Sequence, residues 1–111
     1  MNRADFDRLI ESDLNAYLKG LRDYKESEYA GTADTLANFH NGGRDLEEPP
    51  SVYAIHLMHK HWGAIIKAVR SRKFDWCYRT ADGDEGLKQR LADMRNYVDL
   101  LFALLSEESN P

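Results

Sequence analysis

The stretch that decides the fold is VYAIHLMHKHWGAIIKAVR, residues 52–70. Apolar side chains recur in it every three or four residues, which predicts an amphipathic helix. The stripe expected to be buried consists of Ile55, Met58, Trp62, Ile65, Ile66 and Val69. Two prolines precede the stretch, and Ser51 is the expected N-cap.

Outward from this stretch, the rest of the chain also predicts helices. Helical spacing of apolar residues continues on both sides, and no pattern of period two indicates a strand. The expected helices span residues 3–24, 34–41, 52–72 and 84–105. Asn2 is the expected cap of the first helix, and Thr32 or Asp34 that of the short one. The sequence therefore predicts an all-α fold, a compact bundle of three main helices plus a short one, in a single domain over residues 1–111.

The last of these helices is apolar over more than one stripe. Tyr97, Leu100 and Leu104 lie beside its main apolar seam. A helix that is apolar so far round is usually buried by additional neighbours. A homodimer or higher homo-oligomer would supply them, and a monomer with residues 25–50 folded over that face is the alternative.

Composition narrows the class of protein. The chain has 111 residues, a net charge of −4 and a single cysteine, Cys77. It contains no apolar run long enough to span a bilayer, and its first residues lack the apolar region of a signal peptide. We therefore expect a cytoplasmic protein that neither enters membranes nor binds nucleic acids in general. Between Ser51 and Phe74, however, there are five Lys or Arg residues and no Asp or Glu.

Three of the four histidines lie in the stretch quoted above. His56 and His59 are three residues apart and can face one ion, but zinc requires three or four ligands. Cys77 and a distant carboxylate would have to complete such a site, so we interpret the pair as ordinary histidines and expect no metal site there. His56, Lys60, Gly63, Lys67 and Arg70 share one shoulder of the helix. That shoulder is either an anion-binding surface or a solvated basic face.

The last helix carries a carboxylate in an apolar line. Arg90, Asp93 and Tyr97 follow one another on one side of it, continued by leucines. A carboxylate in such a position requires a partner, and Arg90, Lys60 and His59 are the candidates. Asp93 is then either half of a buried ion pair that fixes helix register or a ligand-holding or catalytic group.

Three segments carry a resemblance to a known family. They are YAGTADTLANF at residues 29–39, the helix containing Lys60-His61-Trp62, and LADMRNY at residues 91–97. Over about residues 15–105 the chain resembles a family of small phage-encoded helical proteins associated with nucleotide modification, which is similar to the MazG-like all-α nucleoside triphosphate pyrophosphatases. The resemblance implies a helical oligomer in a bacterial host cell, with a nucleotide as ligand. The family pattern would gather Asn38, His59, Lys60, Glu85, Arg90, Asp93 and Asn96 around one pocket.

The chain departs from the family at the metal site. MazG-like enzymes hold Mg²⁺ with paired acidic residues on two helices, whereas here the histidine helix has no carboxylate and Arg90 stands three residues before Asp93. Magnesium demands oxygen ligands. It would therefore need substitutes from elsewhere in the chain, for which the candidates are Glu26, Glu28, Asp34 and Glu85.

Two functions follow from this resemblance, and a third needs no ligand. In a nucleotide pyrophosphohydrolase, Lys60 and Arg90 would hold phosphates, Asp93 would bind a cation or orient water, and His59 would act as acid or base. In a non-catalytic sequestering or regulatory protein, the same pocket would only bind the nucleotide, and His56 is a further candidate for ligand binding. Asn38 offers an amide to a base or sugar, or to nearby backbone. The third hypothesis is a helical interaction module.

Overall fold

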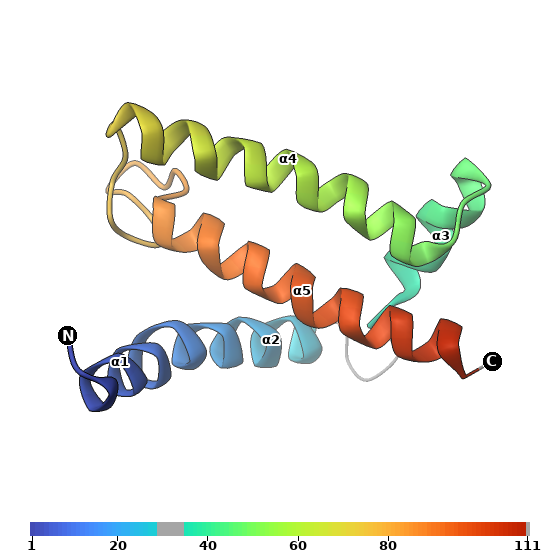
Figure 1. Ribbon diagram of the computed structural model, residues 1–111, viewed down its shortest axis with the longest axis horizontal. Coiled ribbons are helices and arrows are strands. Elements are labelled where there is room, and N and C mark those ends of the chain that lie inside the picture. The colour runs from blue at the N-terminus through green and yellow to red at the C-terminus, as the bar shows by residue number, and fades with distance from the viewer. Residues whose placement is uncertain (29–34, 111) are drawn as a thin grey trace. The chain divides into compact units, whose positions relative to one another are not determined.

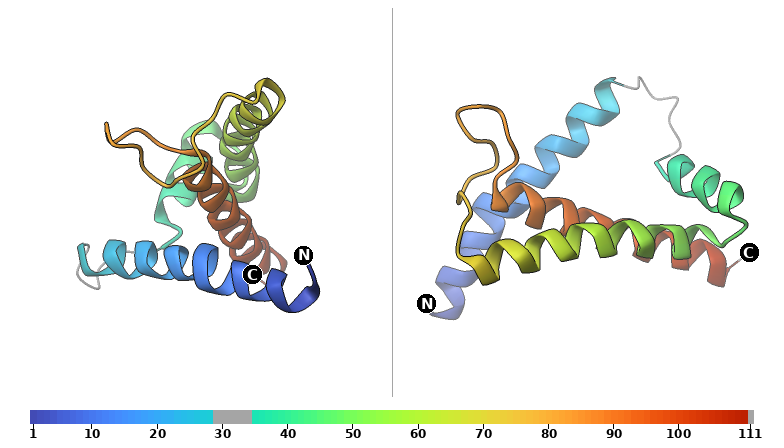
Figure 2. Two further views of the ribbon diagram at one scale, coloured as in Figure 1. Left: turned by 90° about the vertical axis from the view of Figure 1, so that its left-hand side faces the viewer. Right: turned by 90° about the horizontal axis from the view of Figure 1, so that it is seen from above.

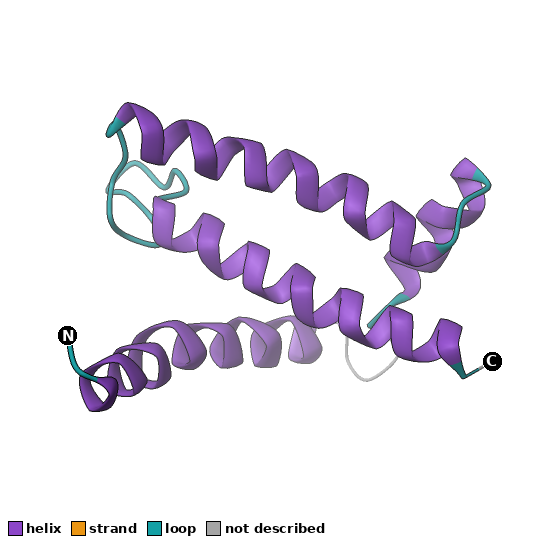
Figure 3. Cartoon of the chain, in the orientation of Figure 1, coloured by secondary structure: helices purple, strands orange, loops and turns teal. Residues whose placement is uncertain are grey.

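The computed structural model describes residues 1–28 and 35–110 (Figure 3). Side chains are described for residues 1–24 and 35–110. Every regular element in these ranges is a helix, which confirms the predicted all-α class. The expected caps Thr32 and Asp34 fall outside the described residues. The chain divides into two compact units, Met1–Ala33 and Asp34–Pro111, each described by itself.

The first unit is one long helical stretch. It consists of α1 (Arg3–Leu9), a π-helical segment η1 (Ile10–Asn15) and α2 (Ala16–Glu28) (Figure 1). The Asn2 side chain accepts a hydrogen bond from the backbone N–H of Asp5 at 2.8 Å, so Asn2 is the cap that the sequence predicts. The helical stretch runs four residues beyond the predicted end at residue 24.

The second unit contains α3 (Ala37–Leu46), α4 (Pro50–Ser71) and α5 (Leu87–Ser109). α4 and α5 form an antiparallel hairpin, and α3 packs where α4 begins and α5 ends (Figures 1 and 2). None of the described helices is both long enough and apolar enough to cross a membrane.

The core of the second unit is built around Phe39 of α3. Phe39 is buried together with Ala54 and Leu104, and its ring makes edge-to-face contacts with Tyr53 and Tyr97 at centroid distances of 6.3 and 6.2 Å. Such aromatic contacts add to the gain from area burial. α3 therefore covers the line of Tyr97 and Leu104 on α5, for which the sequence suggested either a second copy or residues 25–50.

The buried stripe predicted for α4 is only partly correct. Ile65 is buried and Met58 and Ile66 are half-buried, whereas Ile55, Trp62 and Val69 are at least 39% exposed. Ala54, which is not part of the predicted stripe, is buried. The small Ala54 side chain allows close helix packing, so the contact line lies about 100° around the helix from Ile55. The predicted stripe followed the large apolar side chains, and several of these lie on a face that the second unit leaves uncovered.

The N-cap predicted for α4 is also wrong. The helix begins at Pro50 with Pro49 as its cap residue, because proline suits the first helical position, where no N–H partner is needed. The buried Ser51 hydroxyl instead donates a hydrogen bond to Glu108 of α5 at 2.7 Å. This bond, together with the His40–Glu107 contact at 3.1 Å, holds the last turn of α5 beyond its predicted end at residue 105.

Candidate functional site

The candidate site is an open pocket of about 290 Å³ on the α4–α5 hairpin. Leu57, Lys60 and His61 of α4 and Arg90 of α5 line it. Residues 57, 60 and 61 share one side of α4 because three or four residues make one helical turn. The pocket thus lies where two antiparallel helices each contribute a cation.

The start of α5 determines where Arg90 lies. The first N–H groups of this helix find their partners in the preceding loop: Gly86 donates to Tyr78, Leu87 to Asp75 and Lys88 to Cys77, at 2.9–3.1 Å. Unpaired N–H groups at a helix start need such acceptors. α5 therefore begins at Leu87 and not at the predicted residue 84, and Arg90 lies one turn after Gly86.

Gly86 permits this close approach of loop and helix. A Cβ atom at this position would collide with the carbonyl group and Sγ of Cys77. The backbone of Gly86 itself is extended, so the requirement concerns space and not conformation. The loop over residues 75–78 is in this way packed directly onto the first turn of the helix that carries Arg90.

Lys60 and Arg90 are not neutralised by the carboxylates of the described residues. The ion pairs of those residues involve other side chains, among them Arg3–Asp7, Arg8–Asp5 and Lys19–Asp23. Lys60 is exposed and Arg90 is half-buried. Two cations held at one concave site attract anions, and a guanidinium beside an ammonium is well suited to phosphate.

Beside the cations lies an aromatic pair. The rings of His61 and Tyr97 are 4.9 Å apart between centroids and tilted by 41°. Burial raises the pKa of the Tyr97 hydroxyl above its ordinary value, and the charges of Asp93 and then Tyr53 raise that pKa further. A tyrosine is protonated at neutral pH in any case, and the raised pKa of Tyr97 extends the protonated range further into alkaline pH.

Asp93 has the partner that its apolar surroundings require. The side-chain amide of the buried Gln89 donates a hydrogen bond to Oδ1 of Asp93 at 2.9 Å. The sequence suggested Arg90, Lys60 or His59 for this role and did not indicate Gln89. An amide donor orients the half-buried carboxylate and leaves its charge in place, which is the charge that acts on Tyr97.

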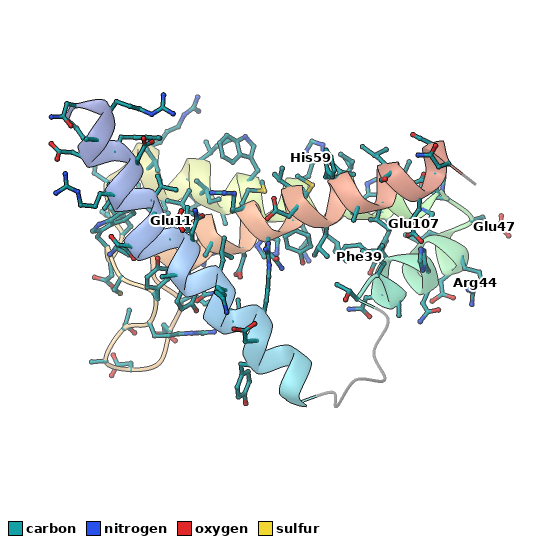
Figure 4. All side chains as sticks on the ribbon, turned by 90° about the horizontal axis from the view of Figure 1, so that it is seen from below. Glu11, Phe39, Arg44, Glu47, His59 and Glu107 are labelled. Atoms are coloured by element: carbon teal, nitrogen blue, oxygen red, sulfur yellow. The ribbon has the colours of Figure 1, made fainter. Side chains whose placement is uncertain are left out.

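The structure brings only some of the expected site residues together. Lys60 and Arg90 share the pocket, and Asp93 lies one turn after Arg90. His59 is exposed on the other side of the hairpin from Phe39 (Figure 4) and does not line the pocket. His56 instead contacts Glu48 at 3.0 Å, near the start of α4.

The remaining expected residues lie outside the pocket lining. Asn38 is exposed in the first turn of α3, and Asn96 is half-buried on α5. Glu85 is exposed in the loop, where its backbone pairs with that of Arg79 in an isolated antiparallel β-bridge. In the described ranges no three His, Cys, Asp or Glu side chains gather closely enough to hold a metal ion.

The sequence did not indicate Leu57, His61 or Gln89 as neighbours of the site, whereas it aligned Tyr97 with Arg90 and Asp93. A helix phase taken from Ile55 and Trp62 turns His61 away from this side of α4. Taking Ala54 as the centre of the contact line would have turned Leu57 and His61 toward α5. Gln89 stands four residues before Asp93, a spacing at which side chains on a helix meet, and this spacing is the signal that could have identified it.

Comparisons of the chain with protein-family models, with curated proteins and with solved structures find no match, so the arguments about function rest on this geometry.

Proposed function

We propose that the protein binds a nucleotide or another phosphorylated small molecule through its phosphate groups, in the pocket between α4 and α5. The observation that carries this proposal is the joint presence of Lys60 and Arg90 in one pocket, without an ion pair to a carboxylate of the described residues. An anion placed there gains two charge-assisted contacts and displaces no partner of either cation within residues 1–24 and 35–110.

The size of the pocket indicates which part of the ligand it holds. Pockets that enclose a whole small molecule have about 300–1,000 Å³, and this one has about 290 Å³ and is open to solvent. A mono- or diphosphate group fits within it, while a nucleoside would extend along its rim. Leu57 and the His61–Tyr97 ring pair supply apolar surface at that rim.

A hydrolytic activity is the second candidate, and Asp93 is the observation that favours it. Its carboxylate lies one turn from Arg90, is oriented by Gln89 and acts electrostatically on Tyr97. In a hydrolase Asp93 would bind a cation or orient the attacking water beside phosphates held by Lys60 and Arg90. The MazG-like resemblance of the sequence is in line with this chemistry.

Calorimetric titration with inorganic phosphate, pyrophosphate and a panel of nucleoside mono-, di- and triphosphates tests the binding proposal. We expect Arg90→Gln and Lys60→Gln each to weaken binding by roughly 10-fold to 100-fold, because each removes one charge-assisted contact. Arg70→Gln is the matched control, since Arg70 is an exposed cation on α4 that does not line the pocket.

Turnover is measured in the same samples by adding Mg²⁺ or Mn²⁺ and quantifying released phosphate or pyrophosphate. Product formation that disappears in Asp93→Asn identifies a hydrolase, and binding with the nucleotide returned unchanged identifies a binding protein. An absence of binding at millimolar ligand, or an equal loss in Arg70→Gln, would contradict the proposal.

A further inference from the structure

The face of the hairpin opposite α3 exposes a continuous set of large apolar side chains. They come from one stripe on each helix, and their exposed fractions run from 39% to 78%. The members are Ile55, Trp62, Val69, Val98, Phe102 and Leu105. We call this set the apolar face.

Helix geometry places both stripes on the same side. Residues 55, 62 and 69 are seven apart on α4, and residues 98, 102 and 105 follow at four and three on α5, so each set lies along one line. Phe39 and the rest of α3 pack on the other side, against Tyr53 and Tyr97. His59, which borders the apolar face, lies across the hairpin from Phe39 (Figure 4).

We propose that the apolar face is where a second copy of this chain docks, so that two hairpins form an antiparallel four-helix bundle. With side-chain areas of about 150–250 Å² for the larger residues, the exposed fractions correspond to on the order of 500 Å² of apolar surface. A stable dimer buries about 800 Å² per partner, of which about 65% is apolar in homodimers. The apolar face therefore matches the apolar part of one ordinary homodimer interface.

The border charges complement a second copy. Arg95 and Asp99 are exposed and one turn apart on α5, beside Val98 and Phe102. When a two-fold axis lies in the interface perpendicular to the helices, α5 runs antiparallel to α5 of the second copy. With the axis at the level of residue 97, Arg95 of each copy lies opposite Asp99 of the other, which brings opposite charges together across the axis.

The other two-fold arrangement is disfavoured by charge. With the axis along the helices, α4 of one copy lies over α5 of the other, and the end of α4 meets the start of α5. Arg70 and Lys88 occupy those ends, the Lys88 ammonium lying over the rings of Trp76 and Tyr78, and bringing these two cations together is destabilising. With the axis perpendicular to the helices, Arg70 of one copy and Lys88 of the other lie at opposite ends of the hairpin.

The mass of the protein in solution tests this assignment. At a concentration on the order of 50 μM, sedimentation velocity should give twice the chain mass of 12.8 kDa. Phe102→Glu should raise the dissociation constant by roughly 30-fold or more, because it places an unpaired charge at the centre of an apolar interface. Phe102 is 78% exposed, so this variant should keep the helical circular dichroism of the parent chain.

Leu46→Glu is the matched control. Leu46 is 56% exposed at the end of α3, away from the apolar face, and this variant should remain a dimer. The direction of pairing is tested by charge reversal: Arg95→Glu should weaken the dimer by roughly 10-fold, and adding Asp99→Arg should restore most of that loss.

Three results would overturn the proposal. One is a monomeric parent chain at the highest soluble concentration, which would leave the apolar face to residues 1–33 or to a different protein. Another is a dimer that survives Phe102→Glu or is lost equally in Leu46→Glu, which would place the contact elsewhere. A charge-reversal pair that shows no loss and recovery would rule out the antiparallel arrangement. All of these readouts are independent of ligand binding in the pocket.

Discussion

Tyr97 is the residue at which the core and the candidate pocket meet. One side of its ring contacts Phe39 in the core, and it also lies against His61 in the pocket lining. Its hydroxyl is partly withdrawn from water and lies near the charge of Asp93, which is why the pKa of this phenol is raised. Protonation of Tyr97 is therefore linked to stability.

Replacing Tyr97 by phenylalanine should change how stability depends on alkaline pH. A raised pKa in the folded state means that the neutral phenol is favoured by folding. This contribution is complete below pH about 10, the ordinary value for tyrosine, and is lost as pH rises through the higher folded pKa. We expect the free energy of unfolding of Tyr97→Phe to fall less steeply than that of the parent above pH about 10.

Urea unfolding between pH about 8 and 11 measures this difference. Tyr24→Phe is the control, because Tyr24 is 64% exposed, and its curve should run parallel to that of the parent. Parallel curves for Tyr97→Phe and the parent would show that the folded state does not favour the neutral phenol.

At the scale of elements, the close packing of the loop against the start of α5 depends on Gly86, which has no side chain. Gly86→Ala introduces a Cβ into the space of the Cys77 carbonyl group, so the loop or the helix must shift. Crowding of this kind costs about 1–3 kcal/mol. We expect Gly86→Ala to lower the free energy of unfolding by about that amount and to weaken phosphate binding through displacement of Arg90.

Gly63→Ala is the matched control within the same unit. Gly63 lies inside α4, and nothing comes within 4 Å of a Cβ added there. Because alanine favours a helix interior over glycine by about 0.8–1 kcal/mol, this variant should gain stability. Opposite signs for the two glycine-to-alanine changes, measured by thermal and urea unfolding, are the expected result, and a stabilising Gly86→Ala would contradict the tight junction.

The elements themselves follow from the sequence, and their relative rotation does not. Apolar spacing predicts each helix because periodicity is a local property of the chain. The rotation of a helix about its axis depends on which face meets a neighbour. In α4 the face with the small Ala54 is buried, and Ile55 and Trp62 remain exposed. The family resemblance implied that Lys60 and Arg90 share a pocket, whereas the position of His61 depends on the rotation of α4 and was not expected.

Caps and helix ends were predicted only where they depend on neighbours in sequence. Asn2 caps α1 through a bond to a residue three positions away. Ser51 binds Glu108 instead, a contact over 57 residues that no local pattern reveals. The bond from Gln89 to Asp93 is of the local kind, because it spans only four residues within α5.

At the scale of the whole molecule, self-association through the apolar face would make thermal stability depend on protein concentration. A dimer that binds folded chains only is stabilised by mass action. We expect the melting temperature of the parent chain to rise by several degrees as concentration increases about 100-fold. Phe102→Glu should have a melting temperature that does not change over this range.

Differential scanning fluorimetry at a series of concentrations makes this comparison. The Leu46→Glu control should retain the rise, because its side chain lies outside the apolar face. A parent chain whose melting temperature is the same at all concentrations would indicate that folded chains do not associate.

The packing of residues 75–78 onto the first turn of α5 has a consequence for how this chain tolerates changes in length. Three backbone hydrogen bonds join residues 75–78 to residues 86–88. A residue inserted between Asp75 and Tyr78 would therefore rotate α5 and move Arg90 away from Lys60. Among the described residues, the backbone hydrogen bonds of the tip between Arg79 and Asp84 stay within it and join Thr80 to Asp84 and Gly83. Related chains that keep the pocket should therefore differ in length at the tip and keep a constant number of residues between Asp75 and Tyr78.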